Sequence, residues 1–173
     1  MSVELVRSLI RDVPDFPSPG ILFKDITPLL ADPKGFASAV DLMSEQIRPY
    51  DPHGLIAIES RGFIFCAALA TSMGLPMHLI RKPGKLPHSK AGLDYDLEYG
   101  SDRLEIHLDA VKPGGRYAVV DDVLATGGTA AAAASLVEQQ QGEVSCCAFL
   151  MELSFLDGRS KLVNRPAESL VIY

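Results

Sequence analysis

The chain has 173 residues and a hydrophobic content of 47%, which suits one domain with a substantial core and excludes a disordered protein. Its formal net charge of −6 argues against non-specific nucleic-acid binding, although a local cluster of cations can still bind a small polyanion. We expect neither a membrane-spanning segment nor a secretory signal, because the sequence has no long apolar run and its first residues lack a basic segment. Three cysteines cannot all pair, which predicts buried thiols in a reducing cytoplasm.

Apolar residues at helical spacing open the chain and predict an amphipathic helix over Val3–Asp12. A connector rich in proline and glycine follows at Asp15–Gly20 and cannot continue that helix. Asp32 before Pro33 is a typical helix start, and apolar residues then recur at helical spacing from Phe36 to Ile47. The sequence therefore predicts a second helix in this region.

Short apolar runs alternate with predicted helices through the rest of the chain, which favours an α/β fold with a parallel sheet. The runs predicted as buried strands are Leu55–Ile58, Met77–Ile80, Tyr117–Val120 and Val144–Leu150, with Ser169–Ile172 as an edge strand. The segment Phe63–Ser72 is predicted as a crossover helix that ends before Gly74. The alanine run Ala130–Ala134 predicts the start of another helix.

A long insertion, Leu86–Asp109, separates the second and third predicted strands. Its second half, Arg103–Leu108, alternates as an antiparallel strand does. Its first half, Pro87–Ser101, is irregular and is predicted to be a flap.

Each predicted strand is followed by charged or polar residues at its carboxyl end. In open α/β sheets, ligands bind outside these ends, near the point where the strand order reverses. We therefore expect several side chains from separate strands to converge on one ligand. These are Arg61, Arg81, Lys82, Lys85, Asp121, Asp122 and Glu152.

The most informative stretch is V-V-D-D-V-L-A-T-G-G-T, residues 119–129. A strand predicted to end at Val120 leads to a glycine turn and then to a helix, whose first N–H groups can bind an anion. Thr126 and Thr129 add hydroxyl donors, and Thr129 is a candidate cap for the helix. The turn matches neither the G-x-x-x-x-G-K-[ST] pattern nor G-x-G-x-x-G.

Asp121 and Asp122 are unusual beside an anion site, because carboxylates repel phosphate. Their natural partner is a vicinal diol, whose hydroxyls can donate hydrogen bonds to them. A diol beside a phosphate describes ribose 5-phosphate. The alternative interpretation is a plain strand, turn and helix with acids at a solvated strand end.

The stretch 119–129 resembles the phosphoribosyl-pyrophosphate (PRPP) signature of the type I phosphoribosyltransferase family. This resemblance implies one domain over residues 1–173, built on a mainly parallel, twisted sheet flanked by helices. It also implies a small N-terminal hood over about residues 1–30 and a flexible loop with a hairpin over about residues 86–109, above the site.

Two further segments resemble the adenine-specific members of the family: R-K-P-G-K-L-P at 81–87 and P-S-P-G-I-L-F-K-D-I-T-P at 17–28. The resemblance implies that the backbone of Leu22, Phe23 and Lys24 reads the adenine edge, while Phe23 covers one ring face and Leu153 packs on the other. Lys24 stands where arginine is common in the family, so the role of its side chain stays open.

The resemblance also implies the remaining site residues. The 5-phosphate loop is Ala125, Thr126, Gly127, Gly128 and Thr129. The pyrophosphate contacts are Arg61, Arg81, Lys82 and Lys85, some of which can act across a dimer interface; a surface arginine and a solvated basic turn are the alternatives. The catalytic residues are Glu98, Asp121 and Asp122, with Tyr99 closing the loop and a cis peptide expected at Glu59–Ser60.

The implied reaction joins adenine and PRPP to give AMP and pyrophosphate, a purine-salvage step. The implied cofactor is Mg²⁺, held by PRPP and water near Asp121 and Asp122 without a direct protein ligand. The family resemblance implies a cytoplasmic homodimer that binds neither nucleic acid nor membrane. Two alternatives remain: a phosphoribosyltransferase for another base, and a non-catalytic PRPP-sensing regulator, which should have a basic surface.

Overall fold

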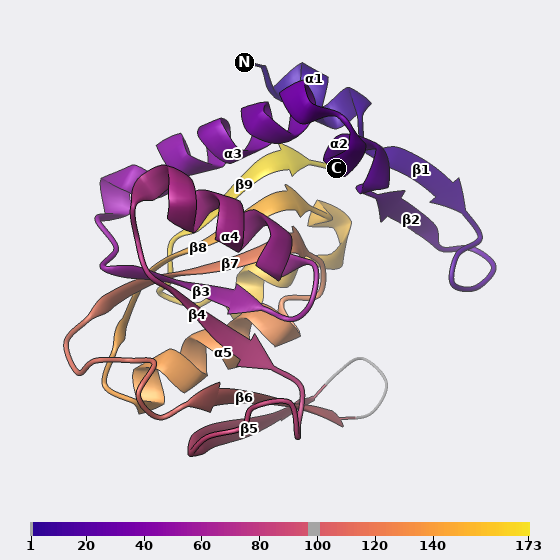
Figure 1. The fold of residues 1–173 in the computed structure, drawn as a ribbon. Coiled ribbons are helices and arrows are strands. Elements are labelled where there is room, and N and C mark those ends of the chain that lie inside the picture. The colour runs from indigo at the N-terminus through magenta and orange to yellow at the C-terminus, as the bar shows by residue number, and fades with distance from the viewer. Residues whose placement is uncertain (1, 97–100) are drawn as a thin grey trace.

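A seven-stranded sheet forms the centre of the fold (Figure 1). In this computed structural model, residues 2–96 and 101–173 are described. In spatial order the strands are β5 (Lys90–Asp96), β6 (Ser101–His107), β4 (Met77–Arg81), β3 (Gly54–Ile58), β7 (Arg116–Leu124), β8 (Glu143–Glu152) and β9 (Ala167–Ile172). The strands from β4 to β9 are parallel, whereas β6 pairs antiparallel with both β4 and β5. The prediction of a mainly parallel sheet with an edge strand near the end of the chain is confirmed.

Helices cover both faces of this sheet (Figure 1). Helices α3 (Pro33–Ile47) and α4 (Gly62–Met73) lie on one face, and α5 (Gly128–Gln139) lies on the other. Strand β3 contributes to both cores: Leu55 and Ala57 pack on the α3 and α4 side, while Ile56 packs on the α5 side. The three cysteines are free and buried, as predicted. Within the described residues, every helix is too short or too polar to cross a membrane.

The N-terminal segment differs from its prediction. Helix α1 spans only Val3–Ser8, and Arg11–Pro14 forms strand β1, so the prediction of a helix to Asp12 is wrong. Strand β1 pairs antiparallel with β2 (Leu22–Asp25), which places Val13 opposite Phe23. The backbone pairing with β2 therefore overrides the helical spacing of the apolar residues. Helix α2 (Thr27–Ala31) then leads to α3, where the Asp32 side chain accepts a 2.7 Å hydrogen bond from the Gly35 N–H, as a helix cap does.

Strand β7 is longer than predicted and runs through both acids to Leu124, so the expected end at Val120 is wrong. The reason is its parallel partner β8, because Val123 still lies opposite Met151 and Leu124 opposite Glu152. Asp121 and Asp122 therefore belong to the sheet. Successive strand residues point to opposite faces, which separates the two carboxylates.

The insertion forms a hairpin. The predicted strand Arg103–Leu108 corresponds to β6, and the expected irregular flap is wrong for Lys90–Asp96, which forms β5. The two strands pair over their whole length, from Lys90 opposite His107 to Asp96 opposite Ser101. Glu98 and Tyr99 lie outside the described residues.

The strand order reverses between β3 and β7. The chain passes from β3 through α4 to β4 on one side, and returns later to place β7 on the other side of β3. The crossovers leave opposite faces of the sheet at this point, so the carboxyl ends of β3 and β7 are where an open α/β sheet binds its ligand. The minor helical turns are η1 (Arg48–Tyr50), η2 (Ser154–Leu156) and η3 (Gly158–Lys161).

Candidate active site

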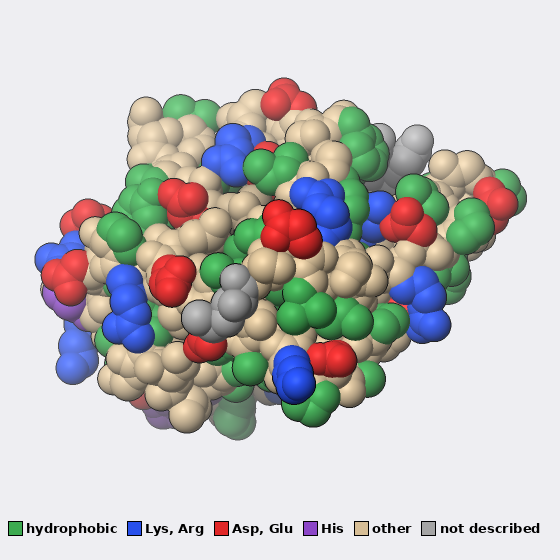
Figure 2. All heavy atoms as spheres, turned by 90° about the horizontal axis from the view of Figure 1, so that it is seen from above, with side chains coloured by type: hydrophobic (Ala, Val, Ile, Leu, Met, Phe, Trp, Pro, Cys, Tyr) green, Lys and Arg blue, Asp and Glu red, His purple; other side chains and the backbone are tan. Residues whose placement is uncertain are grey.

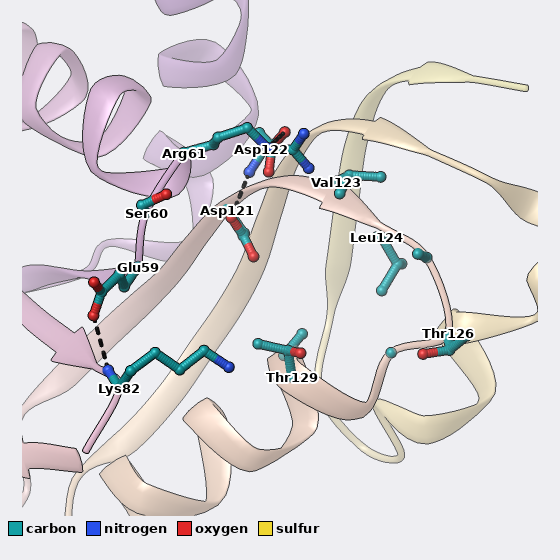
Figure 3. Close-up of a pocket in the computed structure, with 13 residues that line it drawn as sticks. Glu59, Ser60, Arg61, Lys82, Asp121, Asp122, Val123, Leu124, Thr126 and Thr129 are labelled. Carbon is teal, nitrogen blue, oxygen red and sulfur yellow. Dashed lines mark hydrogen bonds and ion pairs between the residues drawn. The ribbon is translucent and has the colours of Figure 1, made fainter. Parts of the chain in front are cut away.

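A cavity of about 500 Å³ lies at the carboxyl ends of β3 and β7 (Figure 3). Its walls come from the turn after β3, the residue after β4, the end of β7 and the start of α5. The lining residues are Glu59, Ser60, Arg61, Lys82, Asp121, Asp122, Val123, Leu124, Ala125, Thr126, Gly127, Thr129 and Ala130. The peptide bond between Glu59 and Ser60 is cis, as the family resemblance implied.

The predicted anion-binding loop forms the floor between β7 and α5. Gly127 has a φ of 77°, a left-handed conformation that glycine adopts without a steric penalty, and it is the N-cap of α5. The prediction that Thr129 caps the helix is therefore wrong. Thr129 lies in the first turn of α5 and is one of the residues that line the cavity. The first N–H groups of α5 and the positive end of its dipole face an incoming anion.

The loop is braced from outside by Gly158, the first residue of η3. A Cβ atom added to Gly158 would collide with the Ala125 carbonyl oxygen and lie 2.8 Å from the Gly127 nitrogen. The two backbones can approach this closely only because both residues lack side chains. The contact with Gly158 thus fixes the position of the anion-binding loop against η3.

Asp121 and Asp122 project from opposite faces of β7, and Figure 3 shows Asp122 beside Arg61 and Asp121 turned toward the Lys82 and Thr129 side. Burial, together with the neighbouring Asp122 charge, raises the pKa of Asp121 well above its ordinary value. Burial also raises the pKa of Asp122, which is only 2% exposed, although the charge of Arg61 opposes this shift. The site therefore keeps two carboxyl groups that favour the arrival of a cation or of hydrogen-bond donors.

Arg61 partly compensates Asp122. Its Nε lies 2.8 Å from Asp122 Oδ2, yet this buried oxygen makes no aligned hydrogen bond within the described part of the chain. The Arg61 guanidinium also lies over the Phe23 ring, 5.3 Å from its centroid. Arg61 is thereby held between the cavity and the hood.

The predicted cations divide into two groups. Arg61 and Lys82 line the cavity, whereas Arg81 and Lys85 do not. Arg81 pairs with Glu59 at 3.2 Å, and Glu59 also accepts a 2.8 Å hydrogen bond from the Lys82 backbone N–H. Burial acts to raise the pKa of Glu59, but these two donors outweigh it and lower that pKa. Glu59 is therefore an ionised anchor that orients the basic turn.

Glu152 was expected at the convergence of charges, and this expectation is wrong. Its side chain is buried in an ion pair with Arg159, whose Nη2 lies 2.5 Å from Glu152 Oε2. Arg159 follows Gly158, so this pair anchors the segment that braces the anion-binding loop.

A second cavity, of about 190 Å³ and largely apolar, opens beside the first under the hood. Leu22, Phe23, Lys24 and Leu153, the four residues predicted to contact the base, all line it. The Lys24 ammonium points elsewhere, because it pairs with Asp12 at 2.6 Å and lies 3.7 Å from the centroid of the Tyr173 ring. Arg61 and Ala125 line both cavities, so the two spaces adjoin.

Of the predicted anion loop, Ala125, Thr126, Gly127 and Thr129 line the main cavity, while Gly128 does not. Sequence reasoning expected a cis peptide between Glu59 and Ser60 but gave their side chains no role, and it gave Gly158 none. Glu59 and Ser60 follow a predicted strand, a position that could have indicated them. Gly158 had no such signal, because its role depends on a backbone approach between distant segments.

The doubly wound sheet, the cavity at the reversal of strand order and the paired acids beside an anion loop define an α/β protein that binds a phosphorylated sugar. Comparison with known families agrees: residues 26–165 match the family model for the phosphoribosyl transferase domain. The chain belongs to this family.

Relatives extend the match over nearly the whole chain. An adenine phosphoribosyltransferase of Synechococcus sp. is 51% identical over 97% of this chain and 98% of its own length. The crystal structure of adenine phosphoribosyltransferase from Thermoanaerobacter pseudethanolicus superposes with a TM-score of 0.97 at 46% identity, covering 99% of this chain and 100% of that one. The Saccharomyces cerevisiae adenine phosphoribosyltransferase, solved with adenine and an imino-altritol bisphosphate, gives 0.91 at 39% identity and 97% coverage of both chains.

The raised pKa of Asp121 predicts a cost in stability. An acid whose pKa is raised on folding loses stability as the pH rises from its ordinary 3.8 through the raised value. Asp121→Asn should therefore raise the melting temperature of the ligand-free protein by several degrees at pH 7, and this gain should vanish below about pH 4. The same variant should lose about 100-fold or more in turnover.

Asp41→Asn, on the exposed side of α3, is the matched control and should change neither the melting temperature nor the turnover. Thermal unfolding across this pH range, with initial rates, measures both effects. A less stable Asp121→Asn protein at neutral pH would contradict the assigned burial cost.

The close approach at Gly158 predicts a different outcome. Gly158→Ala should displace the anion-binding loop and weaken binding of a 5-phosphate ligand such as AMP by about tenfold or more, because a 1 Å misplacement is costly in such a site. Gly74→Ala is the control: a Cβ there would meet nothing within 4 Å, so it strains the backbone, whose φ is 68°, without a collision and away from the cavity. Calorimetric titration with AMP checks this, and equal affinities in the two variants would refute the bracing role.

Proposed function

We propose that this chain transfers the 5-phosphoribosyl group from PRPP to adenine, giving AMP and pyrophosphate. The observation that carries the proposal is the junction at Arg61 and Ala125 of a polar cavity, suited to a phosphorylated sugar, with an apolar one, suited to a flat base. A reaction that joins a base to a ribose phosphate needs these two spaces in contact. The relatives named above, each an adenine phosphoribosyltransferase, support adenine as the base.

The reaction breaks the bond from the ribose anomeric carbon to the diphosphate oxygen and forms a bond to an imidazole nitrogen of adenine, which loses its proton. Positive charge develops on the sugar ring as the leaving group departs. Asp121 and Asp122 accept hydrogen bonds from the ribose hydroxyls, and their negative charge stabilises that positive charge. The loop Ala125–Thr129 holds the 5-phosphate with its N–H groups and hydroxyls, which fixes the ribose between the two cavities.

The departing pyrophosphate needs cations. Arg61 and Lys82 line the cavity and supply two of them from this chain. Glu98, outside the described residues, is assigned by the family resemblance to proton movement on adenine, and Tyr99 to closing the site over it.

Adenine lies under the hood in this proposal. Phe23 covers one ring face, Leu153 packs on the other, and the backbone from Leu22 to Lys24 reads the polar edge. The Lys24 side chain is engaged by Asp12 and Tyr173, so its contribution here is through the backbone alone.

The site suits a divalent cation that arrives with PRPP. Mg²⁺ prefers oxygen ligands and keeps several waters, and the paired acids offer a half-buried carboxyl group on Asp121 and a buried one on Asp122, whose Oδ2 lacks an aligned hydrogen bond in the described residues. Within residues 2–96 and 101–173, no three His, Cys, Asp or Glu side chains form a metal-binding group. Asp121 and Asp122 would hold the ion through water and substrate, and the ion supplies positive charge to the diphosphate.

We propose a homodimer as the working form, in the cytoplasm. Apolar residues of helix α4 also face outward, since Ile64 is 40% exposed and Ala67 is exposed beside it, which favours a covered face. Arg81 and Lys85 lie off their own cavity, so a partner's cavity is a place where they can act. A monomer in sedimentation velocity at micromolar concentration would contradict this.

A regulator that binds nucleic acid is the alternative from another class. Figure 2 shows red and blue side chains interspersed on the face of the molecule seen from above, without a basic patch on that face. The net charge of −6 points the same way.

The test is AMP formation from PRPP and Mg²⁺ with adenine, hypoxanthine, guanine or orotate offered separately. We expect turnover with adenine alone, because the relatives that match nearly the whole chain are adenine phosphoribosyltransferases. An Asp122→Asn preparation, purified in parallel, controls for a contaminating host enzyme. Turnover with another base would replace the assigned substrate, and tight PRPP binding with no turnover on any base would favour the regulator.

A further inference from the structure

Tyr95 and Asp102 lie opposite each other on the hairpin strands β5 and β6. The Tyr95 hydroxyl is 3.3 Å from Asp102 Oδ2 and 3.2 Å from Thr129 Oγ1. Asp102 in turn forms an ion pair with the Lys82 ammonium. Neither hairpin residue lines the cavity, yet together they contact two side chains that do, Lys82 and Thr129.

The Lys82–Asp102 pair is partly open to water, since the two side chains are 38% and 27% exposed. Burial acts to lower the pKa of Lys82, but the Asp102 carboxylate outweighs it and raises that pKa, so the ammonium stays charged. The Lys82 backbone is fixed separately, because its N–H donates to Glu59. The ammonium group can therefore change partners while the backbone stays in place, and partly exposed ion pairs cost little to exchange.

The number of hydrogen-bond donors that Tyr95, Thr129 and Asp102 share limits how they can be arranged. Tyr95 and Thr129 carry one O–H donor each, and the ionised Asp102 carboxylate only accepts. When Tyr95 donates to Asp102, Thr129 must donate to Tyr95. When a phosphate accepts the Thr129 proton, the hydrogen bond between the two hydroxyls is kept only if Tyr95 donates to Thr129, and that donation orients the Thr129 O–H toward the phosphate.

We propose that Tyr95 and Asp102 position the two anion-binding side chains of the cavity. Asp102 is the counter-ion of Lys82 in the free protein and releases the Lys82 ammonium when the diphosphate binds. Tyr95 orients the Thr129 hydroxyl for the 5-phosphate. This rests on the proposed function for the identity of the two anions. Asp102 and Tyr95 are positioning residues, since they touch Lys82 and Thr129 rather than the reacting atoms.

The two roles predict opposite changes for two ligands. Asp102→Asn removes the competitor for Lys82, so pyrophosphate should bind about two- to fivefold more tightly, while AMP binding stays within about 1.5-fold. Tyr95→Phe keeps the ring but removes the hydroxyl, so AMP should bind about two- to fivefold more weakly, with pyrophosphate nearly unchanged. A residue that only stabilises the hairpin would change the affinities for both ligands in the same direction.

Calorimetric titration of the full chain with pyrophosphate and with AMP, each with Mg²⁺, measures these changes. Asp94→Asn is the matched control: it removes one carboxylate from the same hairpin, but Asp94 pairs with Arg103 and its side chain is 73% exposed. It should alter neither affinity.

The crossed pattern, tighter pyrophosphate in one variant and weaker AMP in the other, supports the inference. Parallel shifts of both ligands, or an Asp102→Asn effect no larger than that of Asp94→Asn, would overturn it while leaving the proposed function intact. Failure of the unchanged chain to bind either ligand would contradict the proposed function and the inference together.

Discussion

The desolvation of two adjacent carboxyl groups at the end of β7, Asp122 buried and Asp121 half-buried, is the constraint on which the rest of the site depends. Charged groups are costly to bury, and the pKa values of Asp121 and Asp122 are raised accordingly. The protein offsets only part of this cost, through the ion pair between Arg61 and Asp122. A ligand that brings hydroxyl donors and a cation to the two acids offsets the desolvation cost that Arg61 leaves uncompensated, and this contributes to its binding free energy. The acids beside the anion-binding loop thus favour a ligand that carries both hydroxyl groups and a phosphate.

Close backbone approaches then bring Arg61, the acids and the anion-binding loop together. Gly62 lets α4 begin against β7, because an added Cβ would lie 2.9 Å from both Asp121 Oδ1 and the Val120 carbonyl oxygen. Gly158 lets η3 brace the anion loop in the same way. Arg61, which precedes Gly62, is thereby placed between the acids and Phe23 of the hood. The polar and apolar cavities adjoin at Arg61, Val123 and Ala125, which line both.

Much of this arrangement could be predicted from the sequence, because it depends on local patterns. The parallel strands follow from apolar runs, helix α3 from Asp32 and Pro33, and the anion loop from the glycines after β7. What failed depended on tertiary partners that the local pattern does not show. Strand β7 continues past Val120 because β8 lies beside it, and Glu152 turns away from the cavity to pair with Arg159, seven residues further along the chain. The positions of Tyr95 and Asp102 likewise follow from the hairpin register, which no local pattern encodes.

The most direct test of the buried acid pair is the number of protons exchanged when PRPP and Mg²⁺ bind, measured by calorimetry in buffers of different ionisation enthalpy. Between about pH 4 and neutrality, we expect the unchanged chain to release more protons than Asp121→Asn does, because the ligand drives the carboxyl group of Asp121, whose pKa is raised, to ionise. Asp121→Asn also corrects for protons that the ligand phosphates release. Equal proton release by the two proteins would show that Asp121 is already ionised before the ligand arrives, and that the ligand does not offset a desolvation cost at this acid.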